Sequence, residues 1–183
     1  MVNAVVSPLF PAVLLLAIGL IDLVLNTWVF GVLAFGLLDW IGHLSTAGIL
    51  LLAVAGSDYL GRHHRFTTGA ILGSVLIDVD HILLYTHVPH IAVTGGRPFT
   101  HTLGTVAVLA AVWMVSGRRW SLLGGLTVGV LLHFVRDVAT GSGLALWWPF
   151  SDAGVEVGYP VYVVIMVIMA AVATVRALRR HRN

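Results

Sequence analysis

The sequence predicts an all-α fold, a polytopic transmembrane helical bundle of about six spans. The first observation is composition: 58% of the residues are hydrophobic, 10% are charged, and the mean hydropathy is +0.98. Soluble domains are roughly half apolar and a quarter charged. The second observation is that apolar stretches of about 20 residues, enough to cross a bilayer as a helix, alternate with short polar segments. At 183 residues, the chain is expected to form a single integral membrane domain.

The first candidate span follows Pro8 and continues to about Asn26. No basic segment precedes it, so we expect this helix to be retained rather than cleaved as a signal peptide. Asp22 interrupts the span, and this solitary residue is expected to have a packing role or to be protonated, rather than to take part in the chemistry. Residues 27–38 are also apolar, which predicts either one very long first helix or a kinked or interfacial piece after it.

The second span is expected at residues 38–55 and carries Asp39 and His43 near its start. Residues four positions apart lie on nearly the same face of a helix, so this pair is expected to point toward one neighbour. A short polar loop is expected at 56–65, where the histidines are flanked by arginines and should be solvated.

The third span is expected at 66–85 and contains the most unusual polar segment of the chain, Asp78, Asp80 and His81. Ionisable groups are costly in an apolar run, so a chain that keeps three within four positions is expected to use them. The two aspartates point apart on an ideal helix. For both to bind one ligand, the helix must unwind or end near Val79.

The remaining spans are expected at residues 99–117, 120–139 and 159–175. His101 lies in the first turn of the first of these, and His133, Arg136 and Asp137 lie near the end of the second. His133 and Asp137 repeat the four-residue spacing. Between the last two spans, the segment 147–150 (Trp-Trp-Pro-Phe) is expected to anchor the chain at the membrane interface.

Small residues accompany the polar ones on two of these helices. Gly125 and Gly129 precede His133 at the same four-residue spacing, and Gly69 and Gly73 lie in the third span. Such small-xxx-small stripes let membrane helices approach closely. The polar stripes are therefore expected to face neighbouring helices rather than lipid, which favours one shared site.

Arginine is concentrated at alternate ends of the expected spans. Eight of the ten basic residues lie at 62–65, at 118–119 and at 176–182. These segments fall on one side if six helices alternate, and arginine-rich segments mark the cytoplasmic side of a cell membrane. Both termini are therefore expected to be cytoplasmic. The site candidates then lie at the opposite, non-cytoplasmic ends of their helices.

These candidates form an expected metal centre. Its ligands would be His43, Asp78, Asp80, His81, His101, His133 and Asp137. Aspartate and histidine bind borderline or hard divalent ions, and seven ligands exceed the needs of one tetrahedral ion. We expect two divalent ions, with zinc first and manganese or iron as alternatives. Such two-metal sites activate water and hold the oxygens of a phosphoryl group.

Three further residues are expected to act in catalysis beside the metal. Asp39, or a site histidine not engaged by metal, would shuttle the proton. Arg97 and Arg136 are the arginines on the ligand side of the chain, and a guanidinium group can hold an anionic headgroup through two hydrogen bonds. His87 and His90, in a loop on the same side, are further candidates.

Five motifs in order match those of a known family. They are His43 in Gly-His-Leu-Ser-Thr-Ala-Gly, Asp78-Val-Asp80-His81, Thr100-His101-Thr102, His133-Phe-Val-Arg-Asp137 and Trp147-Trp148-Pro149-Phe150. In these motifs the chain resembles the YdjM-like inner-membrane, metal-dependent hydrolases. The resemblance implies a hydrolase with a metal-site core at 38–150. An N-terminal helix region at 1–37 and a last helix with a basic tail at 159–183 lie outside it.

We therefore expect a metal-dependent hydrolase embedded in a prokaryotic cell membrane. Its partner would be a membrane lipid or lipid-linked substrate, a phosphate or phosphodiester cleaved at the non-cytoplasmic surface. The alternative is a metal-binding membrane protein, a transporter or sensor, without hydrolytic activity. Transporters usually place their site near the bilayer midplane, whereas these ligands gather at one leaflet. The pI near 9.5 reflects arginines at helix ends, so no nucleic-acid partner is expected.

Overall fold

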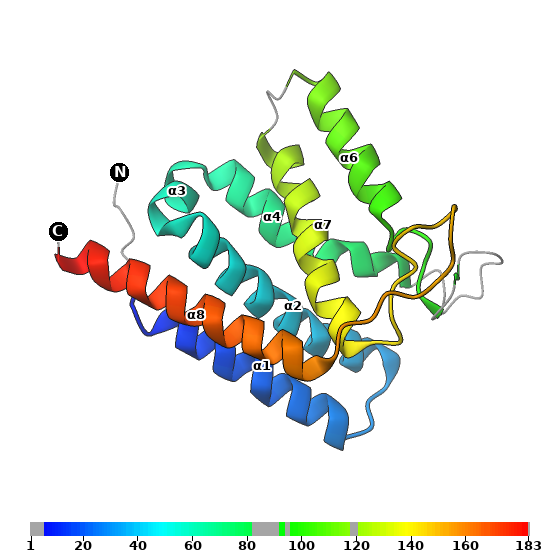
Figure 1. The fold of residues 1–183 in the computed structure, drawn as a ribbon, viewed down its shortest axis with the longest axis horizontal. Helices are drawn as coiled ribbons and strands as arrows, with labels where there is room; N and C mark the ends of the chain where they lie inside the picture. Colours follow the sequence, from blue (N-terminus) through cyan, green and yellow to red (C-terminus); the bar gives the residue numbers. More distant parts are fainter. Residues whose placement is uncertain (1–5, 82–91, 94–95, 118–120, 183) are drawn as a thin grey trace.

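The computed structural model is predominantly helical in the part of the chain that it describes, residues 6–81, 92–93, 96–117 and 121–182 (Figure 1). Its elements are α1 (Phe10–Thr27), α2 (Val32–Val54), α3 (Gly56–Arg62), α4 (His64–Leu76), the 3-10 helix η1 (Ile77–Asp80), α6 (Leu103–Val115), α7 (Ser121–Thr140) and α8 (Tyr159–Arg182). The only extended pairings among these residues are two isolated bridges. The predicted all-α class is confirmed.

Four helices in the described residues are long and apolar enough to cross a membrane: α1, α2, α7 and α8. The predicted count of about six spans is not confirmed. The span expected at 66–85 is a 13-residue α4 continued by η1, and the span expected at 99–117 is α6, also 13 residues. Both elements are shorter than the roughly 20 residues that a perpendicular crossing requires.

The apolar stretch at 27–38 is divided between two helices. Trp28 adopts an extended conformation directly after α1, and Gly31 is also extended where it precedes α2. There is therefore no single long first helix. The second span begins at Val32 instead of residue 38. Hydropathy did not mark this turn because both of its sides are apolar.

Two segments expected to be irregular are helical. The predicted polar loop at 56–65 contains α3, and the last helix continues past residue 175 to Arg182. The extension of α8 brings Arg176 to the end of α2, where it donates hydrogen bonds to the carbonyl oxygens of Ala53 and Val54. Arginine is a good helix former, so the basic tail continues the helix rather than ending it.

Helices α4 and α7 pack backbone against backbone, and this contact is the most extensive in the molecule (Figure 1). A Cβ atom at Gly69 or Gly73 would overlap a carbonyl oxygen of α7. A Cβ at Gly125 or Gly129 would overlap a carbonyl oxygen of α4. The close helix approach that was predicted from the glycine spacing is therefore observed. They let α4 and α7 approach closely enough to bring their polar ends together.

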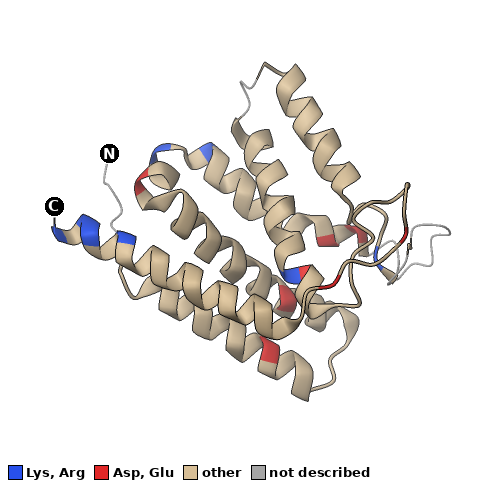
Figure 2. Ribbon diagram, viewed as in Figure 1, with Lys and Arg blue, Asp and Glu red and all other residues tan. Residues whose placement is uncertain are grey.

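Helix α2 lies at the centre of the bundle and contacts α1, α4, α7 and α8. A hydrophobic cluster of Ile18, Ile49, Tyr162, Met166 and Ala170 joins α1, α2 and α8. Charged residues separate to the two ends of the bundle, as Figure 2 shows. Arginines of α3, α4 and α8 lie at one end, and the acidic residues of α1, α2, η1 and α7 lie at the other. The predicted gathering of site candidates at one end is thus observed.

Candidate metal centre

The first group of potential ligands joins α2 to α7. His43 and His133 stack with ring centroids 3.9 Å apart and an interplanar angle of 10°. Asp137 Oδ1 lies 3.5 Å from His43 Nε2, and Asp137 Oδ2 lies 3.1 Å from His133 Nε2. All three side chains are completely buried. Each can offer one ligand atom to a common metal ion.

The second group forms where α4 gives way to η1. The α-helix ends at Leu76, and the 3-10 turn that follows carries Asp78, with His81 at its end. Asp78 Oδ1 lies 3.5 Å from His81 Nδ1 and 3.4 Å from His101 Nε2, and these three residues can also share an ion. The predicted change of helix geometry near Val79 is confirmed.

The two groups are contiguous rather than separate. Asp78 Oδ1 in the second group lies 3.4 Å from His133 Nε2 in the first, and His101 Nε2 lies 3.8 Å from Asp137 Oδ2. The two carboxylates therefore stand between the groups. If each group held a divalent ion, the pair would supply the two Lewis acids of a two-metal site.

Two ligand histidines are oriented by contacts on their far nitrogens. His133 Nδ1 lies 3.0 Å from the carbonyl oxygen of Ser74. Since a carbonyl only accepts, Nδ1 carries the hydrogen and Nε2 is left to face the site. His101 turns Nδ1 toward Asp80 Oδ2 at 3.4 Å, and Asp80 in turn accepts a hydrogen bond from the Thr100 hydroxyl. Ligation by Asp80 itself stays a prediction.

Several buried polar atoms at the centre make no hydrogen bond within the described part of the chain. They are both ring nitrogens of His43 and both ring nitrogens of His101. A buried polar atom without a partner is costly, and a native structure usually explains each one. A divalent ion held by each group would satisfy one nitrogen of each of these rings. The residues present therefore fit a metal centre.

Outside the four candidate spans, the protonation of His101 reflects its surroundings. Burial lowers the pKa of an imidazole, but here the nearby carboxylates of Asp78 and Asp80 outweigh burial and raise it to about 9. Without metal, His101 therefore holds a proton at neutral pH. A metal ion must displace that proton to bind at Nε2.

Arg136 and Asp39 belong to a buried ionic network beside the metal centre. Arg136 Nη2 donates to Asp39 Oδ1 at 2.9 Å and to Asp22 Oδ1 at 2.5 Å, and its Nε also donates to Asp39. Tyr159 OH donates to Asp22 Oδ2 at 2.6 Å. The expectation that Asp22 is solitary is wrong, because α1 packs against α2 and α8 and brings Asp22 to the guanidinium group. The sequence did carry one indication of such a pair, because an acidic and a basic residue that both lie at membrane depth usually contact each other.

Arg97 approaches the same centre from the segment before α6. Its Nη2 lies 3.2 Å from Asp137 Oδ1, close to Gly141, where a Cβ would crowd the guanidinium group. Arg97 and Arg136 both line a cavity of about 680 Å³ that also reaches Asp39, Asp78 and His81. The structure thus brings all ten predicted site residues to one end of the bundle.

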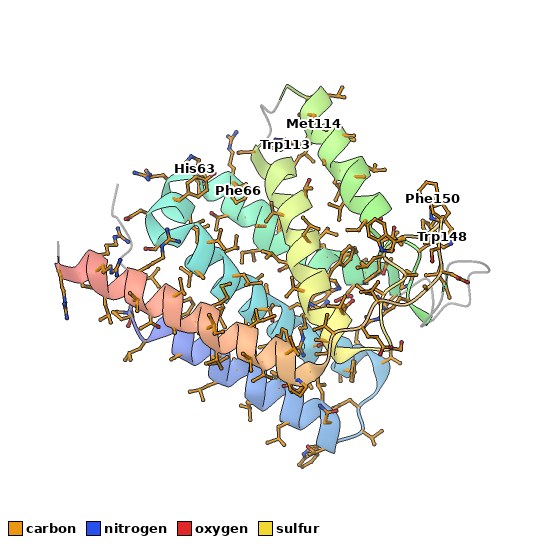
Figure 3. All side chains as sticks on the ribbon, in the orientation of Figure 1. His63, Phe66, Trp113, Met114, Trp148 and Phe150 are labelled. Atoms are coloured by element: carbon orange, nitrogen blue, oxygen red, sulfur yellow. The ribbon has the colours of Figure 1, made fainter. Side chains whose placement is uncertain are left out.

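The other singled-out residues lie elsewhere. His63 stacks on Tyr59 at the opposite end of the bundle, and Figure 3 shows it near Phe66, far from Trp148 and Phe150. Trp148 packs against Phe99 with ring centroids 5.5 Å apart. His87 and His90 fall outside the described residues.

Comparison with known proteins identifies the relatives of this arrangement. The family described as YdjM inner membrane protein matches residues 38–183, most of the chain. The chain belongs to the YdjM family. Every ligand of both metal groups lies within the YdjM match, whereas α1, with Asp22, lies before it.

Two curated YdjM-family relatives come from Escherichia coli K12. Inner membrane protein YbcI is 33% identical over 96 residues, which cover 48% of this chain and 56% of YbcI. Inner membrane protein YdjM is 34% identical over 101 residues, which cover 49% of this chain and 52% of YdjM. The chain therefore spans about half the length of the curated relatives it matches. No solved structure matches it.

Proposed function

We propose that this protein is a membrane-embedded, metal-dependent hydrolase of a lipid-linked phosphate or phosphodiester. One observation carries the proposal. Two contiguous His/Asp groups, with buried nitrogens that lack hydrogen-bond partners in the described residues, adjoin a cavity lined by two arginines. A purely structural polar cluster would be expected to satisfy its own buried atoms.

The donor set agrees with two divalent ions. His43, His133 and Asp137 would hold one, and Asp78, His81 and His101 the other. Imidazole and carboxylate donors suit zinc, manganese or iron. When bound, such ions polarise a phosphoryl oxygen and lower the pKa of water.

The protein's own residues then divide the remaining tasks. Asp39 Oδ2 lies 3.4 Å from His43 Nε2, while Arg136 holds Oδ1, so the carboxylate is oriented to accept a proton at the edge of the centre. Arg97 and Arg136 would bind the phosphate oxygens. Their guanidinium groups would stabilise the negative charge that develops on the phosphate.

The membrane orientation belongs to the same proposal. The arginines of α3, α4 and α8 lie at the end of the bundle opposite the metal centre (Figure 2). By the positive-inside rule this distribution supports the proposal that both termini are cytoplasmic and that the centre lies at the non-cytoplasmic surface. A lipid headgroup at the non-cytoplasmic surface would then reach the metal centre while its lipid stays in the bilayer.

The test is phosphate release from defined lipids. Protein in nanodiscs is supplied with zinc or manganese and with phosphatidic acid or a lipid diphosphate. We expect wild type to hydrolyse at least one of them and Asp78→Asn and His133→Gln to lose that activity. His63→Gln, an exposed histidine outside the centre, is the matched control. Metal binding without hydrolysis of any phospholipid would overturn the enzyme assignment and favour the transporter or sensor alternative.

A further inference from the structure

The cavity beside the metal centre has two chemically different walls. One wall consists of polar groups, including Asp78, Arg97 and Arg136. The lining also includes Leu25 in the last turns of α1 and Phe35 in the first turns of α2, beside Asn26 of the same corner. The space therefore runs from the ligands to the junction of two apolar helices.

That junction, Leu25–Gly36, is here called the α1–α2 corner. Its surface is strongly apolar: Phe35 is 44% exposed and Leu33 is 77% exposed. Both helices are candidate membrane spans, so exposed apolar side chains at the ends where they meet can contact lipid at the membrane boundary. The cavity wall at this corner is thus continuous with a lipid-facing surface.

The polar wall offers donors for an anion. Arg136 is 1% exposed, and its Nη1 has no hydrogen-bond partner among the described residues although the side chain lines the cavity. Arg97 is partly exposed beside it. Guanidinium and phosphate groups form strong charge-assisted hydrogen bonds, so the two arginines that line the cavity offer donors to a phosphate group.

We propose that the cavity is a lateral portal, in which a phosphate-bearing lipid places its headgroup at Arg97 and Arg136 and its hydrocarbon chain across the α1–α2 corner. This inference rests on the proposed function for the fate of the phosphate, but lipid binding can be measured without hydrolysis. It assigns substrate selection to α1, the helix that precedes the family match.

Glycine supplies a matched pair of variants. A Cβ at Gly36, which lines the cavity, would meet nothing within 4 Å, and the same is true at Gly19 on the exposed side of α1. A side chain can therefore start from either position without a clash at its Cβ, but only the side chain of Gly36→Trp would extend from the lining of the portal. Because the chain has no cysteine, Gly36→Cys can also be alkylated after folding, with the unlabelled protein as its own control.

The probe is phosphatidic acid with a photoactivatable diazirine in its acyl chain, diluted in phosphatidylcholine nanodiscs. We expect crosslinks concentrated at the α1–α2 corner in wild type and in Gly19→Trp. Gly36→Trp and alkylated Gly36→Cys should reduce them about tenfold, which corresponds to about 1.4 kcal/mol of binding. A diazirine phosphatidylcholine without an exposed phosphate monoester should label the corner no more than other lipid-facing helices.

Equal labelling of all lipid-facing helices, or Gly36 variants indistinguishable from Gly19→Trp, would overturn the portal. Competition by inorganic phosphate, with no preference for the lipid, would assign the cavity to a soluble ligand instead. The two proposals fail separately. Crosslinking as expected without phosphate release would remove the hydrolase and keep the portal. Hydrolysis unaffected by Gly36→Trp would keep the hydrolase and remove the portal.

Discussion

The clearest energetic prediction concerns Arg136, the buried cation beside the metal centre. Replacing it in Arg136→Met keeps much of its length but leaves two carboxylates, Asp22 and Asp39, without their guanidinium partner. The wild-type contacts are 2.5 Å to Asp22 and 2.9 Å to Asp39, at a side chain that is 1% exposed. Breaking a buried ion pair by removing one partner costs about 3–5 kcal/mol, because the remaining charge stays desolvated.

An exposed ion pair of the same length provides the control. Arg180 Nη2 also lies 2.5 Å from a carboxylate oxygen, that of Asp58, but the two side chains are 22% and 54% exposed. Exposed pairs contribute about 0–1 kcal/mol because water screens them. Arg180→Met should therefore destabilise the protein by about 1 kcal/mol or less. Because the two ion pairs have the same length, the difference between Arg180→Met and Arg136→Met reports the effect of burial.

Both variants can be measured by equilibrium unfolding in SDS from mild detergent micelles, followed by the fluorescence of the six tryptophans. Circular dichroism before unfolding checks that helix content is unchanged. We expect the midpoint of Arg136→Met to fall far below that of Arg180→Met. If the two variants lose equal stability, within about 1 kcal/mol of wild type, the network around Arg136 does not hold α1, α2 and α7 together as argued.

Three further predictions follow from the geometry. Gly125→Leu should destabilise the protein by about 1–3 kcal/mol or more because its side chain must displace the α4 backbone, whereas Gly61→Leu, with open space, should change the SDS midpoint little. The pKa of His101 is about 9, so a metal ion that binds this residue at pH 6 to 8 must displace a proton. The apparent zinc affinity, measured by competition, should therefore rise about tenfold per pH unit between pH 6 and 8. A flat profile would argue against ligation by His101. Chelation should lower the thermal midpoint of the native protein. If metal was present at about 100 times its dissociation constant, its removal lowers the free energy of unfolding by about 2.7 kcal/mol. An unchanged midpoint would count against a bound ion.

Much of the centre was predictable because its pattern is local. The four-residue spacing of His133 and Asp137 fixes their common face, and the apolar runs around them fix the helix. The glycine stripe that ends at His133 also predicted the close approach of α7 to a neighbour. Together, spacing and the sorting of polar residues to one end predicted which residues meet.

What could not be predicted depends on how separate helices pack. Nothing in the sequence around Asp22 identifies Arg136 as its partner, because that contact requires α1 to lie against α2 and α8. The turn before Val32 was hidden by apolar residues on both sides. The helical basic tail was missed because its arginines signal membrane topology while also favouring helix.

The measurement that tests the account most directly is metal content by plasma mass spectrometry on detergent-purified protein. Wild type should retain about two equivalents of zinc, manganese or iron, in line with two contiguous ligand groups. The Asp78→Ala/His133→Ala double variant should lose them, and His63→Ala should keep them. If wild type retains no specific metal under conditions where it remains folded, the His/Asp groups are a structural polar cluster and the hydrolase proposal is wrong.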